Sequence, residues 1–230
     1  MKILILVMSH ETDDKVFDEY KKIWNKQINE HVKEKYPIDV LYLYTDNNIS
    51  ENYIIDGNKL ISKCPENYWD SLLIKVVNGF EYGREKKYDY VFKTNLSTII
   101  NYPKFYDYCL NIDKNRKYIY DGVIGNYEDY SFCSGAGMLL NQESINIVLD
   151  NKDKISKKWT DDIFIGYILN KLYNISPCDL LNRFDIVTPN KVFTENMVTS
   201  CSHIRIKIRI DDQDVHYTNL VYNILHGEKV

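Results

Sequence analysis

The sequence predicts an α/β fold in which a parallel sheet alternates with helices. Residues 2–8 form a continuous apolar run, which is typical of a strand covered on both faces. Residues 38–44 and 88–93 have a similar strand-like character, and two helix-like segments separate the three strands. This alternation indicates right-handed crossovers and a Rossmann-like unit, whose ligand lies beyond the carboxyl ends of the strands.

The two helices of this unit are predicted from apolar residues that recur three and four positions apart. The first is expected over residues 16–28, and Asp13 or Asp14 is positioned to cap its N-terminus. The second is expected over residues 72–80. Together with the strands they make residues 1 to about 100 a predicted nucleotide-binding half.

The second half of the chain has a more mixed pattern. Its expected elements are strands at 118–120 and 132–140, a helix from Thr160 to Leu172, a strand at 204–208 and a helix at 212–225. The chain shows no internal repeat and no Pro/Gly/Ser-rich linker. We therefore expect a single domain over 1–230, in which about 101–230 forms the second half.

Charge and composition exclude several classes of protein. The 29 Lys and Arg side chains against 33 Asp and Glu give a net charge of −4, which does not favour binding to nucleic acid. No apolar run approaches the roughly 18 residues of a membrane span, and the apolar start is too short for a signal peptide. The five cysteines form no CxxC pair, which favours a reducing compartment and a cytoplasmic location.

The pair Asp161-Asp162 opens the helix that follows Thr160. Carboxylates in a first helical turn are stabilised by the helix dipole, and this alone explains many such pairs. The alternative is a general base that faces a cleft from the start of a helix.

Polar residues also follow the third predicted strand, where an α/β sheet binds its ligands. Asn95 and Ser97 are candidates for ligand binding, although both residue types also satisfy the backbone of turns. Lys75 lies among apolar residues of the second helix, where it either extends its ammonium to solvent or contacts a phosphate.

Two further stretches have alternative interpretations. His203, Arg205 and Lys207 alternate along one strand and share a face, which is either a solvated basic surface or a cationic site for an anionic ligand. Residues 131–137 are rich in hydroxyl groups and glycine, which fits a turn or the wall of a substrate site. The motifs GxxxxGK[ST], GxGxxG, HExxH and GxSxG do not occur.

Five segments, taken in order, resemble motifs of the inverting β-1,3-glycosyltransferases of family 31, the galactosyltransferase and Fringe relatives with a GT-A fold. Asn67-Tyr68-Trp69 through Lys75 is similar to the DxYxNLTxK helix, and Tyr90 to Ser97 is similar to the strand ending in KTDDD. Phe132 to Leu140 resembles the YCSGGGYVLS wall, and Asp161 to Gly166 resembles EDVYVG. Ile23-Trp24 resembles the IRxTW segment. The chain also resembles small stand-alone glycosyltransferases of large DNA viruses, which would imply a viral protein in the host cytoplasm.

The resemblance implies a GT-A fold and transfer of a sugar from a nucleotide-sugar, expected to be a UDP-sugar, to a hydroxyl acceptor with inversion. The acceptor would be a glycan, a protein or a small molecule. By resemblance Asp162 is the base, and Asp161 orients hydroxyl groups of the donor or acceptor. The implied donor-binding residues are Ser9, Lys75, Asn95, Ser97, Ser134, Gly135, Arg205 and Lys207.

The chain departs from the family at the metal site. Where the family has three aspartates, this sequence has Asn95, Leu96 and Ser97, whereas Mn²⁺ and Mg²⁺ prefer charged oxygen ligands. Two alternatives stay open. Either a divalent metal is held weakly by Ser97, His203 and the diphosphate, or transfer needs no metal because Lys75, Arg205 or Lys207 neutralises the leaving UDP.

Two other functions are compatible with the same residues. A nucleotide-sugar-binding protein would bind the donor without turnover, and a nucleotidyltransferase would release pyrophosphate. Similarity of fold alone does not decide among these functions. Substrate-dependent release of UDP distinguishes a glycosyltransferase from the other two.

Overall fold

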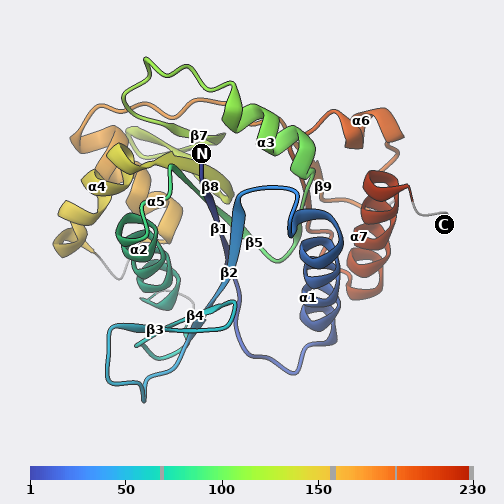
Figure 1. The fold of residues 1–230 in the computed structure, drawn as a ribbon, viewed down its shortest axis with the longest axis horizontal. Helices are drawn as coiled ribbons and strands as arrows, with labels where there is room; N and C mark the ends of the chain where they lie inside the picture. Colours follow the sequence, from blue (N-terminus) through green and yellow to red (C-terminus); the bar gives the residue numbers. More distant parts are fainter. Residues whose placement is uncertain (68–69, 156–158, 190, 228–230) are drawn as a thin grey trace. The chain divides into compact units, whose positions relative to one another are not determined.

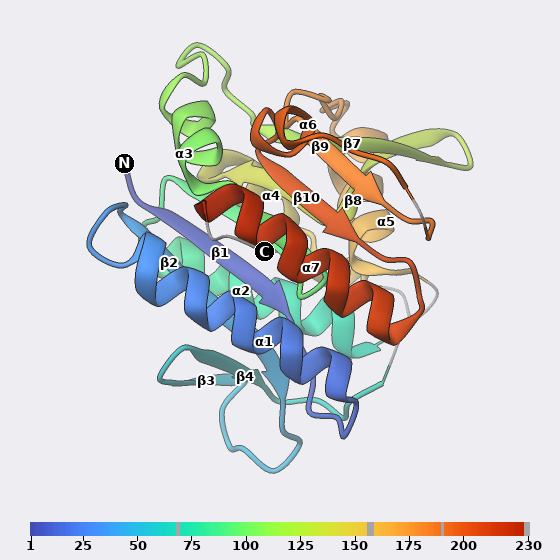
Figure 2. The same ribbon diagram turned by 90° about the vertical axis from the view of Figure 1, so that its right-hand side faces the viewer.

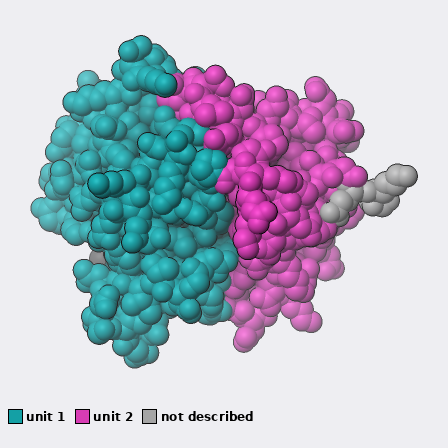
Figure 3. All heavy atoms as spheres, viewed as in Figure 1, with its two compact units in different colours: residues 1–11, 37–95, 113–180 teal, residues 12–36, 96–112, 181–230 magenta. Residues whose placement is uncertain are grey.

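The computed structural model describes residues 1–67, 70–155, 159–189 and 191–227, which form two compact units (Figure 3). Unit 1 consists of residues 1–11, 37–95 and 113–180, and unit 2 consists of residues 12–36, 96–112 and 181–230. Each unit combines segments from both predicted halves of the chain, so the units do not follow a boundary near residue 100. That the chain is a single domain remains a prediction.

Unit 1 contains a seven-stranded mixed sheet with the order β3-β4-β2-β1-β5-β8-β7 (Figure 1). The strands are β1 (Ile3–Met8), β2 (Ile38–Thr45), β3 (Tyr53–Asp56), β4 (Lys59–Ser62), β5 (Tyr90–Asn95), β7 (Tyr120–Tyr127) and β8 (Tyr130–Asn141). The four strands from β4 to β5 are mutually parallel, whereas β3, β7 and β8 pair antiparallel. The predicted α/β fold is therefore confirmed, and its sheet is mixed because three antiparallel strands flank the four parallel ones.

The order of strands reverses beside β1. β1 pairs with β2 on one side and with β5 on the other, so Met8 aligns with both Leu43 and Asn95. In an open α/β sheet, ligands bind outside the carboxyl ends of strands at such a reversal. Ser9, which follows β1, and Asn95, the last residue of β5, therefore lie at the edge where a ligand is expected.

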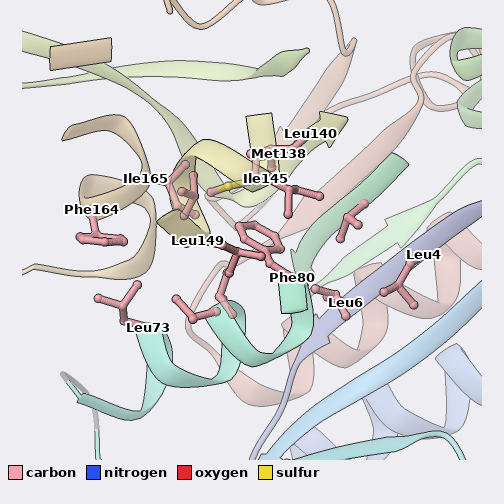
Figure 4. Packing of buried hydrophobic residues seen from close by; sticks show 14 of the residues in the cluster. Leu4, Leu6, Leu73, Phe80, Met138, Leu140, Ile145, Leu149, Phe164 and Ile165 are labelled. Carbon is pink, nitrogen blue, oxygen red and sulfur yellow. The ribbon is translucent and has the colours of Figure 1, made fainter. Parts of the chain in front are cut away.

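The helices of unit 1 pack their apolar side chains against this sheet. They are α2 (Asp70–Glu85), α4 (Gln142–Asp150) and α5 (Asp161–Gly166), with the short segments η2 (Lys152–Lys154) and η3 (Tyr167–Leu172). Figure 4 shows Leu6 of β1, Phe80 of α2 and Ile165 of α5 in one core cluster. The buried side of α5 thus fixes this short helix, whose first residues are the Asp161-Asp162 pair.

Unit 2 has a three-stranded sheet and its own apolar core. The strands are β6 (Thr98–Ile100), β9 (Arg183–Ile186) and β10 (His203–Ile206), and the helices are α1 (Lys15–Gln27), α3 (Tyr102–Leu110), α6 (Glu195–Thr199) and α7 (Asp211–His226), with a π-helical turn η1 (Ile28–Val32). Figure 2 shows α1 and α7 side by side. The Asp14 carboxylate accepts a hydrogen bond from the Val16 amide at 2.9 Å, which confirms Asp14 as the N-cap of α1.

No helix among the residues described above is long and apolar enough to cross a membrane.

Candidate functional site

A buried ion pair lies at the carboxyl end of β5. The Lys93 ammonium is 2.7 Å from the Asp161 carboxylate, and the two side chains are 3% and 6% exposed. The same ammonium donates to the Gly135 carbonyl at 2.6 Å and to Asn95 Oδ1 at 3.4 Å. Burial raises the pKa of Asp161, with a further contribution from the nearby Asp162 charge, whereas Lys93 opposes this shift. Asp161 is therefore engaged inside the protein, which favours a structural role over contact with substrate hydroxyl groups.

Asp162 is half-buried and is held by three hydrogen bonds. Its Oδ2 accepts from the Gly135 amide at 3.0 Å, and its Oδ1 accepts from the Thr160 hydroxyl at 2.5 Å and from the Ile163 amide at 3.0 Å. An ionised carboxylate has about four acceptor positions. One position is therefore left for a ligand.

The glycine-rich stretch of β8 forms a bulge beside these carboxylates. Residues 134–137 fall outside the register that pairs β8 with β5, and they oppose an irregularity in its pairing with β7. A Cβ on Gly135 would lie 2.9 Å from the Lys93 ammonium and 3.2 Å from Asp162 Oδ2. Glycine is required here because the backbone approaches two charged groups at once.

A second glycine brings α5 directly onto β8. A Cβ on Gly166 would lie 2.4 Å from the Cβ of Phe132 and 3.1 Å from the Ser131 carbonyl oxygen. These distances are too short for a side chain, so the helix and the strand meet at van der Waals contact.

A cavity of about 340 Å³ lies at the end of β1. Its lining residues are Met8, Ser9, His10, Glu66, Asn67, Leu72 and Lys75. The volume is typical of a small-molecule site. Ser9 is 2% exposed, and its Oγ has no hydrogen-bond partner within the described residues. A buried hydroxyl without a partner at a cavity wall is available to a ligand.

Lys75 is tied to this cavity wall by three contacts. Its ammonium donates to the Ser9 carbonyl at 2.8 Å and to both carboxylate oxygens of Glu66 at 2.8 and 2.7 Å. Burial lowers the pKa of Lys75, and Glu66 opposes this shift. Partial burial would raise the pKa of Glu66, but hydrogen bonds from Lys75, Thr45 and Ser71 lower it. Both groups therefore form an ion pair rather than a neutral pair.

The strand end Asn95-Leu96-Ser97 does not fit a divalent metal. It offers no carboxylate, and the Asn95 side-chain oxygen already faces the Lys93 ammonium at 3.4 Å. The Leu96 and Ser97 carbonyls accept hydrogen bonds from the Trp24 indole and the Ile206 amide. In the described part of the chain, no group of three or more His, Cys, Asp or Glu side chains could hold a metal ion.

The predicted site residues His203, Arg205 and Lys207 lie in unit 2, and they differ in how far they are buried. His203 is fully buried in β10, with its Nδ1 3.0 Å from the Ser202 hydroxyl. Burial, with a smaller contribution from the Arg183 charge, lowers the pKa of His203 to about 3. Because burial favours the neutral imidazole, we do not expect His203 to add a third cation to this face near pH 7. Arg205 is half-buried and Lys207 is exposed.

The burial of His203 predicts an acid-labile fold. An unfolded histidine titrates near 6.5, so the unfolded state binds this proton first as the pH falls. We expect the wild type to lose about 2 kcal/mol of its free energy of unfolding between pH 7 and 5 through this residue. His203→Gln should show a correspondingly shallower pH dependence in urea unfolding, whereas His216→Gln, at an exposed site, should not. Parallel curves for the wild type and His203→Gln would contradict the assignment.

Sequence patterns missed two side chains that hold this site together, Lys93 and Glu66. Lys93 lies in an otherwise apolar strand, and a charged residue in a buried strand is a signal that could have identified it. Glu66 precedes α2 in an irregular segment, where no periodicity marks it. Tyr68 and Trp69, which belong to the first helix motif of the resemblance, lie outside the described residues.

Among solved structures, the fold is similar to a glycosyltransferase involved in the glycosylation of the major capsid of PBCV-1. The TM-score is 0.56 at 11% sequence identity, and the alignment covers 96% of this chain and 100% of that chain. No family model and no curated protein matches the chain. The seven-stranded mixed sheet and this similarity confirm the predicted fold class, an α/β fold of the GT-A-like glycosyltransferase type. Membership of family 31 stays a prediction.

Proposed function

We propose that this chain is a glycosyltransferase that moves a sugar from a UDP-sugar to a hydroxyl acceptor with inversion. The observation that carries the proposal is the Asp162 carboxylate, which three hydrogen bonds hold beside the glycine-rich bulge with one acceptor position left. The glycosyltransferase-like fold supports the class of reaction.

Inverting sugar transfer requires a base beside the acceptor hydroxyl and groups that stabilise the negative charge of the leaving UDP. Asp162 accepts the acceptor's hydroxyl proton as that oxygen attacks the anomeric carbon. The bond from the anomeric carbon to the phosphate oxygen breaks on the opposite face, and its electron pair leaves with UDP. Attack and departure on opposite faces invert the anomeric centre. Ser134 and Gly135, in the bulge beside Asp162, are assigned to the sugar or the acceptor.

The donor nucleotide is assigned to the cavity at the end of β1. Its apolar side chains suit the face of a base, whereas the Ser9 hydroxyl and the Glu66 carboxylate suit polar groups of a nucleoside. Lys75 supplies the positive charge at this wall. Asn95 and Ser97 stay predicted donor-binding residues because of the resemblance.

Arg205 and Lys207 are proposed to contact the diphosphate. Partial desolvation of the exposed Lys207 side chain lowers its pKa, and the charges of Arg205 and Arg209 lower it further, whereas the Asp214 charge opposes this shift. A diphosphate would add negative charge beside these cations. We expect Lys207→Ala to weaken UDP binding by about 1.5–3 kcal/mol, whereas Lys33→Ala should leave it unchanged. Calorimetric titration with UDP measures both, and equal affinities would remove Lys207 from the site.

We further propose that transfer does not depend on a divalent metal, because the strand end offers no carboxylate and faces an ammonium instead. Transfer in excess EDTA should stay within about two-fold of the rate with Mn²⁺, since hard cations need charged oxygen ligands. The free protein should show no tight Mn²⁺ binding by calorimetry. Loss of activity in EDTA that Mn²⁺ restores would contradict this proposal.

A donor screen tests the function as a whole. Thermal shifts with UDP-, GDP- and TDP-sugars identify the nucleotide, and UDP release is then measured with p-nitrophenyl glycosides as acceptors. A glycosyltransferase that uses a UDP-sugar releases UDP faster when the acceptor is added to the donor, above any slow release by hydrolysis. Stabilisation by the donor without UDP release would favour a binding protein, and pyrophosphate release from a nucleoside triphosphate would favour a nucleotidyltransferase.

A further inference from the structure

Side chains contribute to holding the bulge beside Asp162. The register of β5 with β8 ends at Lys93 opposite Met138, and the register of β7 with β8 resumes at Ile124 opposite Cys133. Residues 134–137 lie between these registers and are held by side-chain contacts as well. Two come from the end of β5, where the Lys93 ammonium donates to the Gly135 carbonyl at 2.6 Å and the Thr94 hydroxyl donates to the Ala136 carbonyl at 2.9 Å.

The Lys93 ammonium contacts three oxygen groups, two through hydrogen bonds and one through an ion pair. Its three partners are the Gly135 carbonyl, the Asp161 carboxylate and Asn95 Oδ1, which come from β8, α5 and β5. Its side chain is 3% exposed and is enclosed by these three elements. It connects the three elements that border the carboxylate pair.

Gly135 connects Lys93 to Asp162. The carbonyl of Gly135 accepts from Lys93, while its amide donates to Asp162 Oδ2 at 3.0 Å. Lys93 also holds Asp161, the residue before Asp162, at 2.7 Å. The position of Asp162 is thus constrained from the strand and from the helix by the same ammonium.

We propose that Lys93 is a positioning residue, whose ammonium sets the geometry of the Asp162 carboxylate by holding the Gly135 carbonyl and Asp161. The inference rests on the proposed role of Asp162 as the base. A reacting group displaced by about 1 Å can lose roughly 10²-fold in rate, so the expected effect is on turnover and not on donor binding.

The test replaces both charges together. Lys93→Met with Asp161→Asn leaves neither charge buried alone, so the protein should fold, because buried pairs replaced as a unit are often neutral in stability. We expect kcat to fall by about 10–100-fold, while the donor KM and the UDP affinity change by less than two-fold. Hydrogen exchange of the Gly135 amide should be faster than in the wild type, because its carboxylate partner has moved.

A matched control removes another buried ion pair of unit 1. Arg116→Met with Asp121→Asn eliminates the pair between Arg116 and the fully buried Asp121, whose two hydrogen bonds to each other do not involve residues 134–137. It should keep both kcat and the exchange rate of the Gly135 amide. Wild-type kcat, or unchanged Gly135 exchange, in the Lys93→Met, Asp161→Asn variant would overturn the proposal.

A second variant tests the proposal if the Lys93→Met, Asp161→Asn variant does not fold. Lys93→Arg keeps the charge opposite Asp161, but its planar guanidinium does not reproduce the contacts of an ammonium. It should lower kcat about 10-fold and accelerate exchange at Gly135, and wild-type values of both would overturn the proposal. If the wild type itself releases no UDP, the proposed function fails, and the exchange rate of the Gly135 amide alone then decides the role of Lys93.

Discussion

Replacement of Asp162 with asparagine should lower the rate of sugar transfer by about 10²–10⁴-fold, the usual contribution of a general base. Asparagine is close to aspartate in size and can still accept the hydrogen bond from the Gly135 amide. It cannot take a proton from the acceptor. The measurement is kcat at saturating acceptor, together with calorimetric affinity for UDP, which should stay within two-fold of the wild type.

A matched control separates catalysis from helix stability. Glu143 is an exposed acid in the first turn of α4, so Glu143→Gln loses a similar interaction with the helix dipole, worth about 0.3–1 kcal/mol. It should reduce thermal stability slightly and leave transfer unchanged. Transfer near the wild-type rate in Asp162→Asn would contradict the assignment of Asp162 as the base.

Replacement of Arg116 with methionine should lower the free energy of unfolding by about 3–5 kcal/mol, the usual cost of leaving one partner of a buried ion pair uncompensated. The guanidinium holds the Asp121 carboxylate with two hydrogen bonds, at 2.6 and 3.0 Å, and Asp121 is fully buried in β7. Without Arg116 the carboxylate has lost its counter-charge. Urea unfolding followed by circular dichroism measures the loss.

The double replacement Arg116→Met with Asp121→Asn tests the cause. Removing both charges should restore most of the stability, because the cost comes from the charge left alone. Equal destabilisation in the single and double variants would show that packing, and not charge, accounts for the loss.

The predicted strands and helices that were long or strongly periodic are found in the structure. Residues 2–8 and 38–44 become β1 and β2, and residues 212–225 become most of α7. The hairpin of β3 and β4 was not predicted, because its strands are short and mostly exposed or half-buried. Such strands carry little hydrophobic pattern and depend on pairing with neighbours.

The candidate site could be predicted only in part, since spacing places residues along the chain and not their partners. The helix start at Asp161-Asp162 and the edge at Asn95 follow from local pattern. Local pattern does not show that Asp161 is engaged in an ion pair while Asp162 keeps a free acceptor position. That difference depends on Lys93, which comes from a strand far away in sequence. The neutral state of His203 also depends on burial, which alternation along a strand cannot reveal when both faces are covered.

The glycine contact between α5 and β8 sets how closely the helix that carries Asp162 approaches the strand that carries the bulge. Where helix and strand touch through Gly166, main-chain and Cβ atoms fix their separation, and neighbouring side chains cannot adjust it. A larger residue at position 166 would push the end of α5 away from Phe132 of β8. Residue 166 thus acts as a spacer, and under the proposed function we expect substitutions there to change the distance between Asp162 and the bulge, and with it the acceptors that fit.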